Sequence, residues 1–462
     1  MLMKPIQDPL PVIPFTRPLR NPRVFVPGSK SISNRALLLA SLTNRKVRLN
    51  GLLRSEDVHW MLDCLRRLGV RIDDVNSETV VVHGCGGVFP AKQADLQVGT
   101  AGTVARLLVG ILGAQPAGRF RVDGSDAMRK RPMAGILEFL ADSGSKVHFE
   151  GNPGRLPVII EPTGIRGGKY RVDASESSQI LSGILMAGAL SQDPIVIELQ
   201  GGTVSHPFIE MTLRMMEAFG ASEVRSFKDP VSFTISDPAG YPFNKDHYLI
   251  ERDATAASYF VMLPKVVGGS LRIADFVRDG LQGDAAFQNV AERVGGVTRL
   301  ITEGASQDLE VTFPHTLRHP DSIDFNAISD TFLSLAAVAP LLSRPIHISG
   351  IAHTRKQESD RVHAMATELR KLGQTVDECE DSLRIVPSMP DLLEAARSGV
   401  VIDTYRDHRV AMSFAILGCR DLLENGQPWM EIRDPGCCAK TFPDFFTVLE
   451  SLRQTTFTAA PQ

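Results

Sequence analysis

Apolar residues gather in two alternating series of segments, and both series predict helices. Members of the first series open with a short polar or glycine-rich stretch and continue with mostly apolar, small residues, which is typical of a buried helix. They start at Ser31, Gly102, Ser177, Asp253, Ser329 and Asp407. Successive starts are 71, 75, 76, 76 and 78 residues apart, so the pattern indicates six repeats.

The second series is amphipathic and alternates with the first. Its segments have one polar face, and they start at Ser55, Arg131, Ser205, Gly283, Glu358 and Lys440. Four of them stop at a glycine, the usual C-terminal signal of a helix: Gly69, Gly144, Gly220 and Gly373. Between the helices lie β-type runs, such as VVVHG, KVHFEG, PVIIEP, IVIELQG, SLRIADF, PIHISGI and LRIVPS. Each repeat therefore predicts two helices and several strands.

Repeats of about 75 residues are longer than the usual units of a solenoid, which favours duplicated α/β domains. A repeat scaffold without chemistry is the alternative on periodicity alone. The stretch 237–248, DPAGYPFNKDHY, is rich in proline, glycine and polar residues and lies between the third and fourth repeats. We expect it to divide the chain into halves of three repeats each.

Composition excludes several classes of protein. The 462 residues carry 50 Lys and Arg against 53 Asp and Glu, a net charge of -3, which argues against binding to nucleic acid or to an anionic membrane. Six cysteines without zinc-type spacing predict neither a disulfide framework nor a metal site, and a reduced cytoplasmic setting is expected. The first residues, MLMKPIQDPLPVIPF, do not resemble a signal peptide, and no apolar run is long enough to span a bilayer.

Cations lie near the predicted starts of the helices, where free N–H groups and the helix dipole favour anions. They are Lys30, Arg35, Arg106, Arg129, Lys130, Arg131, Lys356, Arg361, Arg406, Arg409 and Lys440. Taken singly, each could be a solvated surface charge. Their recurrence at equivalent places in the repeats instead predicts sites for carboxylate or phosphate groups.

The polar openings themselves leave two interpretations open. SKSISNRA (29–36), SSQ (177–179), SDT (329–331), ESDR (358–361) and DHR (407–409) could each be a helix cap or part of a ligand site. GTAGTVAR (99–106) lacks the spacing of nucleotide-binding loops, although Gly102 leaves the backbone accessible to a small ligand.

Taken in order, seven strings resemble the 5-enolpyruvylshikimate-3-phosphate synthase family, the 3-phosphoshikimate 1-carboxyvinyltransferases. They are PGSKSISNRALLLA, GTAGT, the RP of KRPM, SSQ, ESDRVHAMATELRKLG, YRDHRVAM and DPGCCAKTFPDFF, and the likeness extends from about Val24 to Phe446. The resemblance implies an α/β fold of two similar domains, each of three βαβαββ units (an inside-out α/β barrel), with helix N-termini facing an interdomain cleft. The domains would be residues 29–248, and residues 1–28 together with 249–462.

The resemblance also implies a set of site residues. Shikimate 3-phosphate would be bound mainly by the first domain, through Lys30, Ser31, Arg35, Ser177, Ser178, Gln179, Ser205, Asp330 and Gln357. Phosphoenolpyruvate would be bound by Lys30, Gly102, Arg131, Gln179, Arg361, Arg409 and Lys440. Asp330, Glu358 and Lys30 would be catalytic, and closure of the cleft would exclude water.

The implied reaction transfers the enolpyruvyl group of phosphoenolpyruvate to the 5-hydroxyl of shikimate 3-phosphate in aromatic amino acid biosynthesis. It implies no cofactor and no metal, only the two small-molecule substrates, and a monomer. The family is the target of glyphosate. Thr100 and Leu107 depart from its usual Asn and Pro, which leaves glyphosate sensitivity open, and Gln357 and Phe208 replace a frequent Lys and Tyr.

A rival with the same repeat design is UDP-N-acetylglucosamine enolpyruvyl transferase. That enzyme typically begins with an AKN string and carries a cysteine on a loop of its first domain. Here SKSISNR stands in place of the first, and GSDAMRKRPM (124–133) contains no cysteine. The sequence therefore favours the shikimate enzyme.

Overall fold

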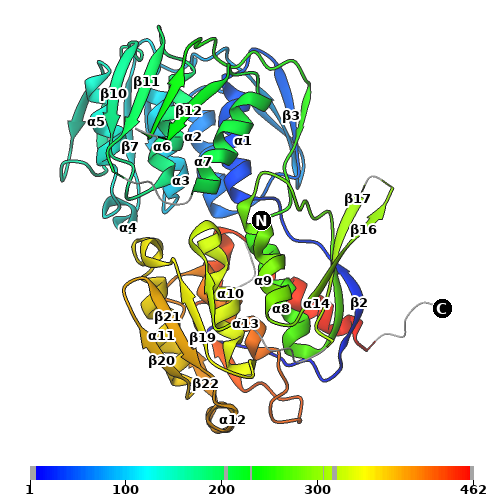
Figure 1. Cartoon of the computed structure of the whole chain (residues 1–462). Helices are drawn as coiled ribbons and strands as arrows, with labels where there is room; N and C mark the ends of the chain where they lie inside the picture. The colour runs from blue at the N-terminus through cyan, green and yellow to red at the C-terminus, as the bar shows by residue number, and fades with distance from the viewer. Residues whose placement is uncertain (1–6, 202–205, 229–230, 305, 315–319, 458–462) are drawn as a thin grey trace. The chain divides into compact units, whose positions relative to one another are not determined.

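The protein is described by a computed structural model covering residues 7–201, 206–228, 231–304, 306–314 and 320–457. The chain divides into two compact units: unit 1 comprises Met1–Pro27 and Arg252–Gln462, and unit 2 comprises Gly28–Glu251. The N-terminal segment thus belongs to the same unit as the C-terminal half, and the blue strand β2 (Leu19–Val24) lies in one sheet with β16 (Val297–Glu303) and β17 (Ser306–Thr312) (Figure 1).

Unit 2 is built around three buried helices, α1 (Lys30–Leu42), α3 (Gly102–Gly113) and α6 (Ser178–Gly188). Two glycines allow α3 and α6 to approach closely. A Cβ on Gly110 would lie 2.5 Å from the carbonyl oxygen of Gly183, and a Cβ on Gly183 would lie 2.6 Å from that of Arg106. The amphipathic helices α2 (Glu56–Arg67), α5 (Ala134–Asp142) and α7 (His206–Ala218) alternate with the buried ones along the chain.

Three four-stranded sheets complete unit 2, and all three share one topology. In each, the first two strands are parallel and the remaining neighbours are antiparallel. The strand orders are β14-β3-β5-β4, β6-β7-β9-β8 and β10-β11-β13-β12. Their bounds are β14 (His247–Leu249), β3 (Lys46–Asn50), β5 (Thr79–His83), β4 (Ile72–Asn76), β6 (Gln93–Gln97), β7 (Arg119–Asp123), β9 (Val158–Glu161), β8 (Lys146–Phe149), β10 (Gly168–Val172), β11 (Ile195–Leu199), β13 (Val231–Ile235) and β12 (Val224–Lys228).

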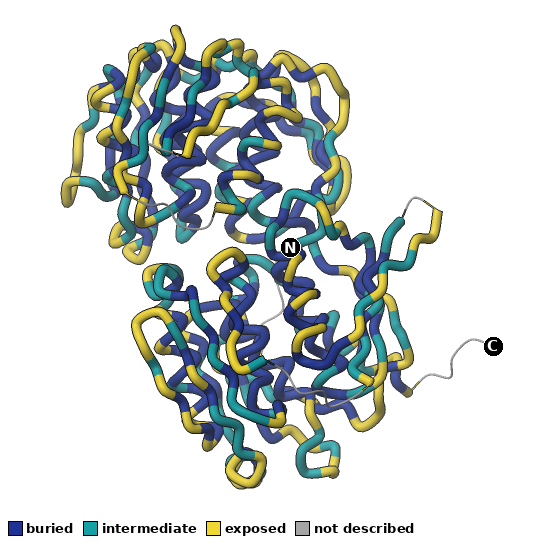
Figure 2. Tube along the Cα trace, viewed as in Figure 1, coloured by how far each residue is buried: buried dark blue, intermediate teal, exposed yellow. Residues whose placement is uncertain are grey.

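Unit 1 repeats this design around α8 (Ala254–Val267), α10 (Phe332–Val338) and α13 (His408–Gly418). The helices α9 (Phe287–Arg293), α11 (Arg361–Lys371) and α14 (Phe445–Thr455) alternate with them along the chain, and α12 (Met389–Ser398) is additional. Figure 2 shows that the buried backbone of each unit lies in its interior, whereas exposed residues are concentrated on the peripheral turns.

Two sheets of unit 1 have the topology of unit 2, and the sixth is smaller. The orders are β16-β17-β15-β2 and β18-β19-β21-β20, and the three-stranded sheet is β1-β23-β22. The further bounds are β15 (Gly269–Ile273), β18 (Ser322–Asp324), β19 (Ile346–Ser349), β21 (Ser382–Val386), β20 (Thr375–Glu378), β1 (Leu10–Pro11), β23 (Met430–Ile432) and β22 (Val400–Ile402). Strands from the N-terminus, β2 and β1, therefore complete the fourth and sixth sheets.

The predicted α/β class is confirmed, and the four predicted C-terminal glycines have φ of +85° (Gly69), +118° (Gly144), +91° (Gly220) and +75° (Gly373). Three predicted helix starts lie in 3₁₀ rather than α-helical turns. The segment from Gly283 starts in η1 (Gly283–Ala286) and becomes α-helical only at Phe287. The segment from Ser329 lies first in a 3₁₀ helix, η2 (Asn326–Thr331). The segment from Lys440 becomes α-helical only at Phe445, because Pro443 and the preceding 3₁₀ turn (Pro435–Lys440) delay it.

No helix in the described part of the chain is both long enough and apolar enough to cross a membrane.

Candidate active site

A buried arginine at the start of α11 organises the charged residues of unit 1. Arg361 is 1% exposed, and its guanidinium group donates to three carboxylates: Asp330 Oδ1 at 2.8 Å, Glu358 Oε2 at 2.8 Å and Asp407 Oδ2 at 2.8 Å. It also donates to Gln357 Oε1. A buried guanidinium requires such partners, because charge is costly to remove from water.

Two further cations join this network. Arg409, in the first turn of α13, donates to Asp330 Oδ2 at 2.7 Å, and Lys440 Nζ lies 3.2 Å from Glu358 Oε1. Asp330 thus bridges Arg361 and Arg409, while Glu358 bridges Arg361 and Lys440. Six of the predicted site residues, from four separate segments, form one cluster that we call the Arg361 network: Asp330, Gln357, Glu358, Arg361, Arg409 and Lys440.

The pKa shifts in the Arg361 network follow from this pairing. Burial alone lowers the pKa of Arg361, but Asp407, Glu358 and Asp330 outweigh it and leave the pKa above its ordinary value. The pKa of Arg409 is likewise raised despite its burial, first of all by Asp330. Both side chains are therefore permanent cations, suited to holding anions and unsuited to exchanging protons.

Three residues beside the Arg361 network were not among the predicted site residues. Asp407 is fully buried, caps α13 by accepting from Arg409 N at 2.9 Å, and accepts from Ser359 Oγ at 3.0 Å in addition to Arg361. Tyr259 on α8 is buried, and its phenol interacts with Arg409. Burial and the neighbouring Asp330 raise the pKa of Asp284 to about 7. The DHR string was a sequence signal for Asp407, whereas no local motif marked Tyr259 or Asp284.

Gly102 is the centre of a second group of predicted residues, in unit 2. It opens α3, and a Cβ there would lie 2.7 Å from Arg131 Nη1 and 2.9 Å from Arg106 Nη1. Arg106 also donates to Gln179 Oε1 at 2.8 Å, and Gln179 Nε2 donates to Thr103 Oγ1 at 3.0 Å. Two guanidinium groups and the N-terminus of α3 therefore lie together at Gly102. Because glycine has no side chain, the space beside them suits a small anion.

The start of α1 holds three other predicted residues, in different environments. Lys30 and Ser31 are half-buried, and Lys30 Nζ lies 3.4 Å from Asp57 Oδ2. Arg35 is 1% exposed and donates to Thr212 Oγ1 at 2.8 Å, Ser182 Oγ at 3.2 Å and Ser31 O at 3.1 Å. Burial lowers the pKa of Arg35 to about 10. In this structure Arg35 ties α1 to α6 and α7, and its role as a ligand stays a prediction.

The serines predicted to bind shikimate 3-phosphate lie near the start of α6. Ser177 caps that helix, because its hydroxyl accepts from Gln179 N at 3.3 Å, and Ser178 is its first residue. A capping role does not prevent a hydroxyl from donating to a ligand, since its proton is not used by the cap. Ser205 lies outside the described residues.

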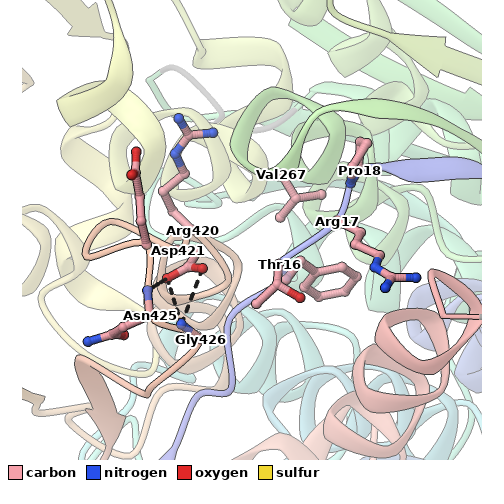
Figure 3. A pocket seen from close by; sticks show the side chains of 10 residues that line it. Thr16, Arg17, Pro18, Val267, Arg420, Asp421, Asn425 and Gly426 are labelled. Carbon is pink, nitrogen blue, oxygen red and sulfur yellow. Dashed lines mark hydrogen bonds between the residues drawn. The ribbon is translucent and has the colours of Figure 1, made fainter.

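A pocket of about 500 Å³ in unit 1 is separate from these groups. It is lined by 15–18, Val267, 420–421 and 424–426, none of which is a predicted site residue. Figure 3 shows Asp421 accepting from the backbone of Asn425 and Gly426, and the guanidinium groups of Arg17 and Arg420 lie on opposite sides of the pocket. The pocket does not contain a convergent set of charges.

Comparison with known proteins identifies the family of the chain. Residues 20–449 match the family described as EPSP synthase (3-phosphoshikimate 1-carboxyvinyltransferase). The chain is 47% identical to the 3-phosphoshikimate 1-carboxyvinyltransferase of Opitutus terrae, over 97% of this chain and 99% of the relative. It is 40% identical to the protein of that name from Nostoc sp., over 95% of this chain and 98% of the relative.

A solved structure supports the fold independently. An EPSP synthase from Acinetobacter baumannii superposes with a TM-score of 0.77, covering 96% of this chain and 98% of the other, although only 23% of the residues are identical. The match to the family extends over nearly the whole chain, and the strings on which the sequence resemblance rests lie within it. The chain belongs to the EPSP synthase family.

Proposed function

We propose that this chain transfers the 1-carboxyvinyl group of phosphoenolpyruvate to the 5-hydroxyl of shikimate 3-phosphate and releases phosphate, a step of aromatic amino acid biosynthesis through chorismate. Family membership and the names of the relatives support the activity. The Arg361 network is the structural observation that carries the proposal, because it gathers two carboxylates and three cations from four segments of the chain.

The Arg361 network suits a reaction between anions. Phosphoenolpyruvate carries a carboxylate and a phosphate within a few atoms, so its binding requires several cations. In unit 1, Arg361, Arg409 and Lys440 are paired with Asp330 and Glu358. A bound carboxylate or phosphate would compete for the same cations, and this competition would leave Asp330 and Glu358 available to move protons.

The group around Gly102 in unit 2, with Arg131, Arg106 and Gln179, supplies the other part of the proposed phosphoenolpyruvate site. Arg131 and the N-terminus of α3 would hold one charged group of phosphoenolpyruvate, with Lys30 and Gln179 as further ligands. Shikimate 3-phosphate would be bound by Lys30, Ser31, Arg35, Ser177, Ser178, Gln179 and Ser205, and by Asp330 and Gln357 from unit 1. Hydroxyls and cations at helix starts suit its phosphate and ring hydroxyls.

The chemistry proceeds by addition and elimination. The 5-oxygen forms a bond to C2 of phosphoenolpyruvate while it loses its proton and C3 gains one, which gives a tetrahedral intermediate. The C2–O bond to phosphate then breaks and C3 loses a proton, which restores the double bond. We assign the hydroxyl proton to Asp330 and the proton at C3 to Glu358 and Lys30. These reaction steps involve no net oxidation or reduction, so we propose that the reaction needs neither a cofactor nor a metal.

The experiment that tests this function measures phosphate released from phosphoenolpyruvate by the purified protein. We expect release that depends on added shikimate 3-phosphate. Release with UDP-N-acetylglucosamine and not with shikimate 3-phosphate would contradict the proposal. Glyphosate titrated against phosphoenolpyruvate in the same assay measures sensitivity directly, and dialysis against EDTA tests the absence of a metal requirement.

The role of Asp330 can be tested in the same assay. Asp330→Asn keeps the shape and removes the base, so kcat should fall by roughly 100- to 10,000-fold. The matched control is Asp377→Asn, which alters an exposed carboxylate paired with Arg384 and should retain activity. Near-normal kcat in Asp330→Asn would refute the assignment of the base while leaving the overall reaction intact.

We further propose that the enzyme acts in the cytoplasm as a monomer and does not bind nucleic acid. The near balance of 50 basic and 53 acidic residues supports the last point. Light scattering on the purified protein would test the oligomeric state.

A further inference from the structure

Two consecutive residues directly before α13 have left-handed backbone conformations. Tyr405 has φ of 54° and Arg406 has φ of 59°. Residues with a Cβ adopt this region at a cost in free energy, and bulky side chains are rare there. Such a pair persists only where surrounding contacts hold it, and it is found most often at functional sites.

A buried carboxylate on α11 provides the holding contacts. Glu368 is fully buried, and it accepts from the Tyr405 hydroxyl at 2.7 Å and from Asp403 N at 3.1 Å. Lys371 Nζ lies 2.9 Å from Oε2 of Glu368, the oxygen that also accepts from Asp403 N. A carboxylate removed from water requires partners of this kind, so breaking one of them is costly.

Helix α11 also contacts the segment 403–407 through a second residue, Arg361. Arg361 lies seven residues before Glu368, on the same side of α11, and donates to Asp407 Oδ2 at 2.8 Å. Asp407 N in turn donates to Thr404 O at 2.8 Å, which closes the turn containing Tyr405 and Arg406. The segment 403–407 is therefore attached to α11 at both ends, and α13 continues directly from it.

We propose that Glu368 is a positioning residue for Arg409, acting through the hydroxyl of Tyr405. By holding the left-handed pair, it sets the direction of the first turn of α13, where Arg409 donates to Asp330. The inference rests on the proposed function in so far as Arg409 binds phosphoenolpyruvate. The left-handed pair and its contacts are independent of that function.

The first test does not require activity. In Tyr405→Phe the ring remains and the hydroxyl is lost, so hydrogen–deuterium exchange of peptides covering 403–411 should become at least severalfold faster. The matched control is Tyr241→Phe, which removes the hydrogen bond of a buried tyrosine in unit 2 to Met186 O at 2.7 Å. It should leave exchange at 403–411 unchanged. Unchanged exchange in Tyr405→Phe would overturn the proposal.

The second test separates positioning from general loss of stability. Tyr405→Phe should raise the KM for phosphoenolpyruvate by roughly tenfold, the effect of one hydrogen bond to a charged group, while the KM for shikimate 3-phosphate changes little. Glu368→Gln should give the same pattern, because an amide has one acceptor oxygen where the carboxylate has two. Equal changes in both KM values would indicate a merely structural role.

A residue at position 406 that adopts the left-handed conformation at lower free energy should reverse the raised KM of Tyr405→Phe. Asn tolerates this conformation better than Arg does, so Arg406→Asn added to Tyr405→Phe should return the KM for phosphoenolpyruvate toward that of Arg406→Asn alone. Strictly additive effects would contradict the proposal. Absence of turnover in the wild-type protein would instead contradict the proposed function, and the exchange measurement would then decide the positioning role.

Discussion

At the scale of the residue, two aspartates at predicted helix starts have different partners. Asp407 caps its helix through Arg409 N, as a cap interpretation of DHR requires, and also binds the buried Arg361. Asp330 has a cap position in the sequence, but both of its oxygens accept from arginines. Spacing along the chain could not distinguish them, because the deciding partners lie 31 to 79 residues away.

Gly102→Ala should weaken phosphoenolpyruvate binding without unfolding the protein. The added methyl group would lie 2.7 Å from Arg131 Nη1 and 2.9 Å from Arg106 Nη1, and these flexible guanidinium ends would shift away. A displacement of this size should raise the KM for phosphoenolpyruvate roughly ten- to hundredfold. Steady-state kinetics with both substrates measures it.

The control for this change is Gly151→Ala in the same unit. A Cβ on the exposed Gly151 would meet only Pro157 Cδ at 3.6 Å, an ordinary contact. Its KM values should equal those of the wild-type protein. An unchanged KM in Gly102→Ala would remove Gly102 from the proposed site.

Asp284→Asn should change how stability depends on pH. The carboxyl has an ordinary pKa of 3.8, raised in the folded protein to about 7 by burial and by Asp330. Between these values the folded protein holds a proton that the unfolded chain has released, so a rise in pH favours unfolding, by about 1.4 kcal/mol per pH unit at most. In the asparagine variant this decrease in the free energy of unfolding with pH is absent, and the amide oxygen can still accept from the Thr255 hydroxyl.

Urea denaturation at pH 5, 6, 7 and 8 measures the effect. The free energy of unfolding of Asp284→Asn minus that of the wild-type protein should increase from pH 5 to 7 and become level near pH 8. A difference that stays constant over this range would contradict the raised pKa.

At the scale of the element, sequence periodicity predicted which helices are buried more accurately than where each begins. Helix α3 starts at the predicted Gly102, whereas α14 starts five residues after the predicted Lys440. Burial follows from a run of apolar residues, which the sequence contains. A start depends on local hydrogen bonds and on neighbours such as η2 or Pro443, which compete with the α-helical conformation.

Gly183→Ala should destabilise the contact between α3 and α6. Its Cβ would lie 2.6 Å from the carbonyl oxygen of Arg106, and a backbone atom cannot move without shifting α3. We expect a loss of roughly 1 to 3 kcal/mol in the free energy of unfolding. Urea denaturation checks it.

Gly188→Ala on the same helix is the matched control. There the added Cβ would meet the side-chain atom Ile235 Cδ1 at 2.8 Å, which can rotate away, and alanine favours the helix by up to about 1 kcal/mol. The two variants should therefore differ in sign or clearly in size. Equal changes in the free energy of unfolding for the two variants would show that the packing of α3 against α6 does not depend on Gly183.

At the scale of the whole molecule, the two units differ in how the chain completes them. Every sheet of unit 2 is formed within Gly28–Glu251, including β14, which returns to pair with β3. Unit 1 depends on the distant N-terminus, because β2 pairs with β15 and Arg23 binds Asp308 Oδ2 at 2.7 Å. The two segments of unit 1, Met1–Pro27 and Arg252–Gln462, are thus separated in sequence by all of unit 2.

This difference predicts how fragments behave. Residues 28–251 alone should show a cooperative unfolding transition by circular dichroism. Residues 252–462 alone should not, because the fourth and sixth sheets would each lack a strand, and addition of a peptide covering 1–27 should restore part of the transition. A cooperative transition in 252–462 without the peptide would contradict the role of the N-terminal strands.

The repeats, the α/β class, the family resemblance and the types of residue that carry the proposed chemistry could all be predicted from the sequence. These properties depend on residues that are close together in the sequence, through apolar periodicity and short motifs. Which charges lie together follows from the folded structure: Arg361 contacts Asp330, Glu358 and Asp407, and Arg131 lies with Arg106 at Gly102. Electrostatic pairing and close packing depend on distance in space, which separation along the chain does not specify.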